Sequence, residues 1–155
     1  MAEPSKLADK TVKHLGVPWE KTYGYAQAVQ VKDVIYVSGQ LSHDDEGNLV
    51  GPAPTDASGR VIDTSNMEVQ MRTTYANAAR VLAQFGATLD HVVEEVIYVT
   101  DLDAAFAVAG AVRKAAYGTD APACASTIAG ITRLAFPQQL VEISFTAVLP
   151  DQPST

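Results

Sequence analysis

The residue whose position most invites a chemical role is Glu142. It lies between Val141 and Ile143 in an apolar stretch near the C-terminus, where alternating residue types predict a β-strand. If the face that carries Glu142 is solvated, the carboxylate simply meets water. If another subunit covers that face, the carboxylate lines a cleft, and burial raises its pKa toward values that suit a general acid or base. The periodicity leaves both alternatives open.

A second group of polar side chains begins at Cys124, the only cysteine. A single cysteine excludes a disulfide within the chain. No His follows it at a motif-like position, and a lone cysteine is more typical of a small buried hydrophobic residue than of a nucleophile. Ser126 and Thr127 come next and are either ordinary strand residues or polar groups that line a site.

The histidines do not form a recognisable metal-binding pattern. His14, His43 and His91 are far apart, and His43 starts a polar run that is typical of a solvated turn, His43-Asp44-Asp45-Glu46. The sequence also lacks a Gly-rich phosphate loop, an HExxH motif and a CxxC pair. We therefore expect neither a metal site nor a cofactor.

The elements that must position these residues begin with a β-hairpin. Residues 25–31 and 34–37 are rich in β-forming residues and are joined by Lys32-Asp33. Residues 51–63 are rich in Gly, Pro and Ser/Thr and predict a loop. Ser65 with Glu68 matches a capping box, and the apolar spacing behind it predicts a helix that continues to Phe85 and ends at Gly86.

The second half predicts strands at residues 92–100, 125–131 and 140–149. Between the first two lies a helix capped by Asp101 or Asp103 and ended near Tyr117 by Gly118. The element order is β-β-α-β-α-β-β, an α/β (α+β) fold with both helices on one face of the sheet. We expect one domain over residues 1–155, of which residues 1–18 form an N-terminal leader. Apolar residues on both faces of the strands predict a homo-oligomer.

Composition limits the classes of partner. The chain has 155 residues and a formal net charge of −7, and its basic residues are scattered, which argues against nucleic-acid binding. No apolar stretch is long enough to span a bilayer. The polar residues 1–10 do not resemble a secretory signal. These features predict a cytoplasmic protein that acts on a small molecule.

Several stretches, taken in order, resemble the RidA/YjgF family of reactive-intermediate deaminases. The matching segments, spread over residues 22–149, read YGYAQAV (23–29), YVSGQ (36–40), NAARVL (77–82), GATLDHVV (86–93), VTDLD (99–103) and LVEI (140–143). The resemblance implies a chorismate-mutase-like fold. It also implies a homotrimer with substrate clefts between subunits.

Members of this family hydrolyse imines or enamines to a ketone and ammonia without a cofactor. Carried over to this chain, the resemblance implies that Tyr25 lines the cleft and that Ser38 and the Gly39 backbone contact substrate. Glu142 would position or activate the water. The leading hypothesis is thus a hydrolase of C–N bonds that acts on an imine, enamine or ring amide without an essential carboxylate. In it Ser126 or Cys124 acts as a donor and Glu142 as the base.

The chain departs from the family at the arginine that binds a substrate carboxylate. Deaminating members read Pro-Ala-Arg-Ser, whereas this chain reads PACAST from Pro122 to Thr127. Cys124, Ala125 or Ser126 takes the arginine's place, depending on the alignment. We therefore expect weak or no activity on simple 2-imino acids. The alternative is a trimer that binds a small molecule without catalysis; an endoribonuclease is disfavoured by the acidic charge.

Overall fold

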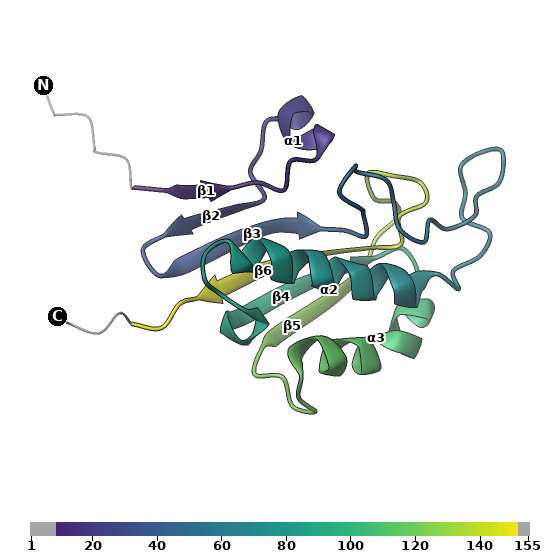
Figure 1. Cartoon of the computed structure of the whole chain (residues 1–155). Helices are drawn as coiled ribbons and strands as arrows, with labels where there is room; N and C mark the ends of the chain where they lie inside the picture. Colours follow the sequence, from purple (N-terminus) through teal and green to yellow (C-terminus); the bar gives the residue numbers. More distant parts are fainter. Residues whose placement is uncertain (1–8, 152–155) are drawn as a thin grey trace, which may run out of the picture.

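The structure is a computed structural model, and it describes residues 9–151. It contains one six-stranded sheet in the order β1-β2-β3-β6-β4-β5, in which only β4 and β5 run parallel (Figure 1). The strands are β1 (Thr11–Lys13), β2 (Ala28–Val31), β3 (Val34–Gln40), β4 (Val92–Val99), β5 (Ala125–Gly130) and β6 (Val141–Val148). The helices are α1 (Pro18–Tyr23), α2 (Met67–Ala83) and α3 (Leu102–Tyr117), with a short 3-10 turn η1 (Leu89–His91) before β4.

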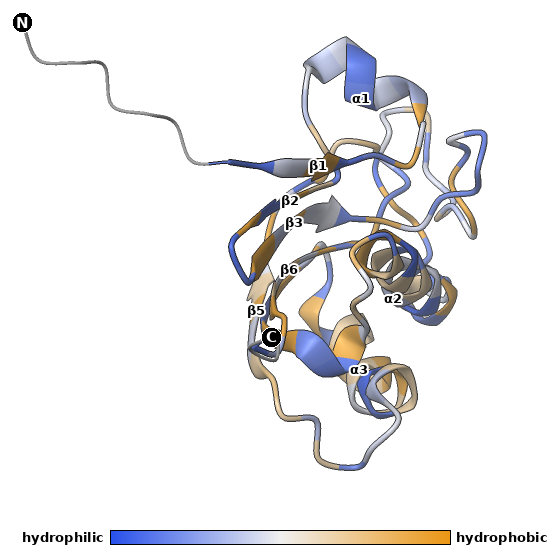
Figure 2. Ribbon diagram, turned by 60° about the vertical axis from the view of Figure 1, so that its left-hand side comes forward, coloured by the Kyte–Doolittle hydropathy of each residue, from blue (hydrophilic) through white to orange (hydrophobic). Residues whose placement is uncertain are grey.

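The predicted order of strands and helices over residues 25–149 is confirmed. Lys32 adopts a positive φ of 52° in the two-residue turn between β2 and β3. Residues 51–63 form the expected loop, with one isolated bridge from Thr55 to Val61. The sheet is mixed, and α2 and α3 lie together on one of its faces, as Figure 2 shows from the side.

The two long helices differ in how well their ends were predicted. Asp101 caps α3 by accepting a hydrogen bond from the Ala104 amide, and Gly118 ends that helix in the left-handed conformation, as expected. The capping box expected at the start of α2 is absent. The N-cap residue is Asn66 rather than Ser65, and the Asn66 side chain donates to the Pro52 carbonyl instead of capping the helix.

The core lies between the sheet and the two long helices. Along β6, Val141, Ile143 and Phe145 are buried under the helices, while the residues that alternate with them face the other way. From α2, Met71, Tyr75 and Leu82 pack against this layer, together with Val112 of α3. The opposite face of the sheet carries no helix among the described residues (Figure 2).

The N-terminal segment differs from the expected leader. Residues 1–8 lie outside the described part of the chain, but residues 11–13 form β1, which pairs antiparallel with β2 at the edge of the sheet. Val17 is buried, and α1 begins directly after it. This part of the segment is therefore built into the domain. Between residues 9 and 151, no helix is long and apolar enough to cross a bilayer.

Candidate active site

A β-bulge in β3 shapes the centre of the candidate site. Three steps along β3, from Val37 to Gln40, correspond to only two along β6, from Phe145 to Ile143. The extra residue interrupts the alternation, so Ser38 and Gly39 are both half-buried before Gln40 returns to the core. Bulges re-aim side chains next to functional sites. Here the bulge brings the Ser38-Gly39 segment against the side chain of Glu142.

Glu142 lies on the face of β6 that the helices do not cover. Its neighbours along the strand, Val141 and Ile143, are completely buried on the other face. The Gln139 side-chain amide donates to Glu142 Oε1 at 3.4 Å. Burial raises the pKa of Glu142, and the hydrogen bond from Gln139 opposes that rise only in part. A buried carboxyl group with a raised pKa is suited to act as a general acid or base.

These groups line a cavity of about 430 Å³, which is within the size range of small-molecule sites. Its lining residues are Trp19 and Tyr23 of α1, Tyr25, Ser38, Gly39, Leu41, Ala135, Phe136 and Glu142. Three segments far apart in the sequence therefore meet at one site. Tyr25, Ser38, Gly39 and Glu142 were all expected there, and the structure brings these four together.

The polar groups of the cavity are held by the neighbouring backbone. Ser38 Oγ donates to the Ala26 carbonyl at 2.7 Å, and the Ser38 amide donates to the Gln27 carbonyl at 2.8 Å. Burial, together with the negative charge of Glu20, raises the pKa of Tyr25. Tyr25 therefore keeps its phenolic proton at neutral pH and can serve as a hydrogen-bond donor.

Cys124 and Ser126 lie elsewhere within the chain. Ser126 pairs with Glu95 of β4 on the face that packs under the helices, and its Oγ donates to Glu95 Oε1 at 2.8 Å. Tyr117 Oη lies 3.5 Å from Cys124 Sγ. Burial raises the pKa of the Cys124 thiol, which argues against a resting thiolate. The sheet separates both residues from the Glu142 of the same chain.

Thr127 follows Ser126 in β5 and therefore faces the opposite side of the sheet. It pairs with Val96, so it shares the uncovered face with Glu142, but it is not among the residues that line the cavity. The expected site is therefore divided. Four of its members form one cavity, Cys124 and Ser126 lie on the helix side of the sheet, and Thr127 stands on the uncovered face, two strands away from Glu142.

Glu95 is the centre of a buried polar network that the sequence did not predict. This carboxylate is fully buried and accepts hydrogen bonds from Tyr75 Oη at 2.8 Å and Tyr117 Oη at 2.7 Å. It also forms an ion pair with Arg113 of α3 and receives the Ser126 hydroxyl. The signal was present, because Glu95 is in register with the buried Ile97 and Val99. A carboxylate on that face of a buried strand needs several partners.

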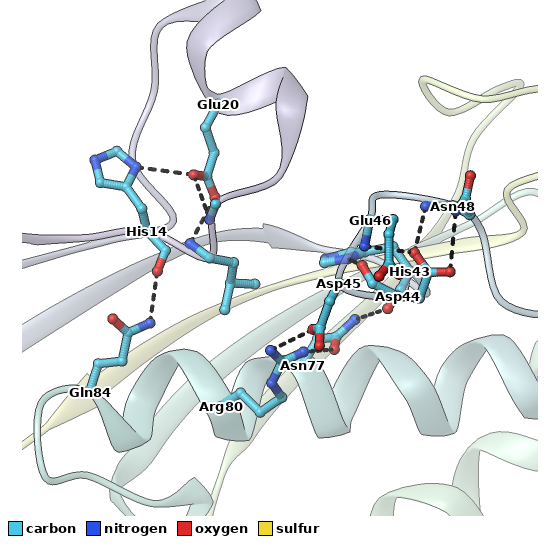
Figure 3. Close-up of polar contacts among 12 residues, drawn as sticks. His14, Glu20, His43, Asp44, Asp45, Glu46, Asn48, Asn77, Arg80 and Gln84 are labelled. Atoms are coloured by element: carbon cyan, nitrogen blue, oxygen red, sulfur yellow. Dashed lines mark hydrogen bonds and ion pairs between the residues drawn. The ribbon is translucent and has the colours of Figure 1, made fainter.

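The turn that begins at His43 is structural in the described chain. Asp44 Oδ1 accepts hydrogen bonds from the amides of Glu46 and Asn48, and Arg80 forms an ion pair with Asp45 (Figure 3). The ring of His43 is buried and contacts Trp19 edge to face. No group of three His, Cys, Asp or Glu side chains between residues 9 and 151 is arranged to hold a metal ion.

Sequence reasoning missed most of the apolar wall of the cavity. Trp19, Tyr23, Leu41 and Phe136 come from α1 and from loops, where no periodic pattern assigns a face to a side chain. The one usable signal was Trp19, the only tryptophan, placed directly after Pro18 at the start of a helix. Gln139, which contacts Glu142, was likewise not singled out.

Comparison with known proteins assigns the chain to a family. The family model described as Endoribonuclease L-PSP matches residues 19–149. A YjgF/YER057c/UK114-family protein from Mycobacterium tuberculosis has a similar fold, with a TM-score of 0.70 and 27% identity over 91% of this chain and 100% of that chain. A YjgF-family protein from Neisseria meningitidis gives a TM-score of 0.67 and 25% identity over 94% of this chain and 98% of that chain.

A third similar structure comes from Yersinia pestis and is described as a protein of unknown function of the conserved Rid family. It has a TM-score of 0.68 and 25% identity, and the match covers 91% of this chain and 100% of that chain. The resemblance inferred from the ordered sequence segments is thereby confirmed, and the chain belongs to the Endoribonuclease L-PSP family, that is, the YjgF/RidA family.

Proposed function

We propose that this protein hydrolyses a small imine, or an enamine after its protonation to an iminium ion, in the cavity beside Glu142. The observation that carries the proposal is the position of Glu142, a carboxylate whose pKa is raised by burial, against Ser38 and Gly39 in a cavity of suitable size. Such a group can take a proton from water and return it later. The reaction needs no cofactor, since a protonated imine is already electrophilic.

The proposed steps balance as follows. An enamine first takes a proton from solvent on carbon and becomes an iminium ion; an imine takes a solvent proton on nitrogen. Water then attacks the iminium carbon while Glu142 removes a proton from that water. Glu142 returns the proton to nitrogen, the C–N bond breaks with its electron pair leaving on nitrogen, and the hydroxyl proton passes to the departing ammonia. The products are a ketone or aldehyde and ammonium.

Cys124 and Ser126 enter this proposal only through a neighbouring subunit. Ser126 lies in the edge strand β5, whose first three residues are exposed in the single chain, and Cys124 comes directly before that strand. In a homotrimer with clefts between subunits, this edge would approach the Glu142 cavity of the next subunit. Cys124 or Ser126 would then donate a hydrogen bond to the substrate, and Thr127 would lie beside them.

The uncovered sheet face supports such an assembly. Tyr36 and Val148 are exposed on it, and Val96 and Tyr98 are only half-buried. Burying apolar area of this kind drives subunit association. Light scattering coupled to size exclusion should give a trimer, and a monomer at micromolar concentration would contradict it. We take the cytoplasm as the compartment, since the single cysteine gives no sign of an oxidising environment.

The direct test is turnover of imines generated in situ from amines by an oxidase, followed by the rate of ketone release. The Glu142→Gln variant should lose about 10²-fold or more of the rate, the range for a lost general base. Full activity of E142Q would remove the assignment. Mixed trimers of E142Q and Ser126→Ala subunits should regain part of the activity if the two residues act across an interface.

A binding protein without catalysis is the second candidate. The observation that favours it is the apolar lining of the cavity, in which four of the nine lining residues are aromatic and Glu142 is the only acid. Native mass spectrometry that finds a retained small molecule, with no product released over time, would favour this candidate over the hydrolase.

A further inference from the structure

The wall of the Glu142 cavity is mostly aromatic. Trp19, Tyr23, Tyr25 and Phe136 surround it, and Leu41 and Ala135 add aliphatic surface. The family resemblance assigned a role to only one of these, Tyr25. A wall of this kind favours ligands with apolar or aromatic groups, because each ring removes a large area from water on binding.

The aromatic wall is held in place before any ligand binds. The Trp19 ring meets the ring of Phe136 at a centroid distance of 5.6 Å and the ring of His43 at 5.2 Å, both edge to face. A Cβ built on Gly47 would lie 3.0 Å from Trp19, so the 43–48 turn also packs against the indole. Such preorganisation lowers the entropy lost when a ligand is bound.

Helix α1 is anchored by the residue that follows Trp19. Glu20 is buried and accepts hydrogen bonds from the Leu15 amide at 2.9 Å, the Gly16 amide at 3.0 Å and the Gln27 side chain at 2.9 Å. His14 Nδ1 lies 3.4 Å from Glu20 Oε1, and Gln84, the C-cap of α2, donates to the His14 carbonyl (Figure 3). The short helix is therefore fixed to the sheet and to α2, and Trp19 with it.

The charge of the cavity complements a cation. Glu142 is the only Asp, Glu, Lys, Arg or His among the residues that line it. Arg113 is paired with Glu95 on the other face of the sheet, and Arg60 and Arg133 line a separate cavity. A carboxylate on the ligand would face Glu142 without a compensating positive charge among these lining residues. An iminium would be attracted by Glu142 and by the faces of the aromatic rings.

We propose that the substrate is an imine with an aryl or branched alkyl substituent and without a carboxylate, bound as its iminium cation between the aromatic wall and Glu142. This inference rests on the proposed hydrolysis and names its substrate class. Trp19 and Phe136 are the specificity-determining residues, since they contact the apolar substituent. The reaction is addition of water to the C=N carbon followed by loss of ammonia, and it needs no further reactant.

A matched set of three imines tests the substrate class. 1-Phenylethanimine carries a methyl group where 2-imino-2-phenylacetate carries a carboxylate, and the two are otherwise identical. Propan-2-imine has a methyl group in place of the phenyl ring. The value of kcat/KM should be at least about tenfold higher for 1-phenylethanimine than for the carboxylate analogue, since like charges in a shared site repel. Equal values, or a preference for the carboxylate, would overturn the proposal.

Variants test whether the aromatic wall causes the preference for 1-phenylethanimine. Phe136→Leu should lower kcat/KM for 1-phenylethanimine by about tenfold, equivalent to about 1.4 kcal/mol, and leave propan-2-imine within about twofold. Phe106→Leu is the matched control, because Phe106 is 64% exposed on α3 and does not line the cavity. A loss that is the same for both imines would contradict a specificity role.

Binding separates this inference from the proposed hydrolysis. Trp19 is the only tryptophan, so its fluorescence reports directly on the cavity. 1-Phenylethylammonium should bind at least about tenfold tighter than its isosteric anion 2-phenylpropanoate, and E142Q should remove the difference. If no imine is hydrolysed but the cation preference holds, the hydrolase fails and the ligand class stands. If the anion binds equally well, the ligand class fails.

Discussion

The carboxyl group of Glu142 occupies the space where a side chain at residue 39 would be. A Cβ built on Gly39 would lie 2.6 Å from Glu142 Oε2 and 2.7 Å from its carboxyl carbon. Gly39 belongs to the β3 bulge and has no unusual backbone requirement, since its φ is not among the positive values. Glycine is needed at this position for its lack of a side chain.

The first prediction concerns that contact. Gly39→Ala forces the Glu142 carboxyl group to move, because three of its side-chain atoms would lie within 3 Å of the new methyl group. We expect at least an about tenfold fall in imine turnover, since a general base acts only in the correct geometry. Stability should fall by less than about 1 kcal/mol, because the displaced side chain faces the cavity.

The matched control is Gly110→Ala on α3, where a new Cβ meets nothing within 4 Å. Alanine inside a helix should raise stability by about 0.5–1 kcal/mol and leave turnover unchanged. If G39A kept full activity in an assay where E142Q is inactive, the close contact would have no functional meaning.

A second prediction follows from the raised pKa of Glu142. Its folded-state pKa lies above the unfolded value because burial disfavours the charged form. The folded state therefore binds the proton more tightly, and this contribution to stability is present at low pH and lost as pH rises through the folded pKa. E142Q cannot ionise, so it should gain stability relative to the native chain between pH 4 and pH 7. Urea unfolding at pH 4 and pH 7 gives the difference in free energy of unfolding between E142Q and the native chain. An equal difference at the two pH values would contradict the raised pKa.

Gln139 gives a third prediction, for activity rather than stability. Its side-chain amide donates to Glu142 Oε1 and lowers the pKa of that carboxyl against the effect of burial. Gln139→Met keeps a side chain of similar length but removes the donor. The acid limb of the kcat/KM profile, which reports the free enzyme's base, should then move to higher pH. A lower rate with an unmoved limb would mean that Gln139 acts only through packing.

The elements around the site were predictable because their patterns are local. The alternation in β6 placed Glu142 opposite the core. Gly118 ends α3 as expected, and Asp101, one of the two expected caps, begins it. The start of α2 was misjudged for a local reason as well. Asp63 accepts a hydrogen bond from the Ser65 amide, so the serine belongs to a turn before the helix and does not cap it.

The division of the site was not predictable, because it depends on strand pairing. Ser126 lies opposite Glu95 because β4 and β5 pair in parallel with that register. No local sequence pattern before Ser126 predicts this register. The aromatic wall depends equally on tertiary contacts, since Trp19 and Phe136 are over 100 residues apart in the sequence. Family resemblance located Ser38 and Gly39, but the bulge that aims them appears only in the structure.

The buried network at Glu95 gives a fourth prediction. Glu95→Gln removes the charge that Arg113, Tyr75 and Tyr117 share, and leaves Arg113 without its partner. Breaking a buried pair in this way should cost about 3–5 kcal/mol in the free energy of unfolding. Glu94→Gln, on the same strand but exposed, should change it by no more than about 0.5 kcal/mol. Similar losses in both variants, measured by urea unfolding, would contradict a stabilising role for the network.

The last prediction concerns the anchor of the aromatic wall. Burial alone would raise the pKa of Glu20, but hydrogen bonds from the Leu15 amide, the Gln27 side chain and the Gly16 amide outweigh it and lower the pKa overall. The stability from Glu20 is thus present above the unfolded pKa and lost as pH falls through the folded pKa. Glu20→Gln should cost about 2 kcal/mol at pH 7, because hydrogen bonds to a charged acceptor are the stronger ones.

The cost should also shrink toward acid pH, where the native carboxylate becomes protonated. Glu68→Gln is the control, since Glu68 forms only an exposed ion pair with Arg72. This substitution should change the free energy of unfolding by about 0.5 kcal/mol or less. If E20Q leaves stability unchanged but broadens or shifts the Trp19 fluorescence, the hydrogen bonds of Glu20 position α1 without contributing to the stability of the whole domain. An unchanged spectrum together with unchanged stability would show that these hydrogen bonds do not fix the wall, and the preorganisation argued for the cavity would lose its support.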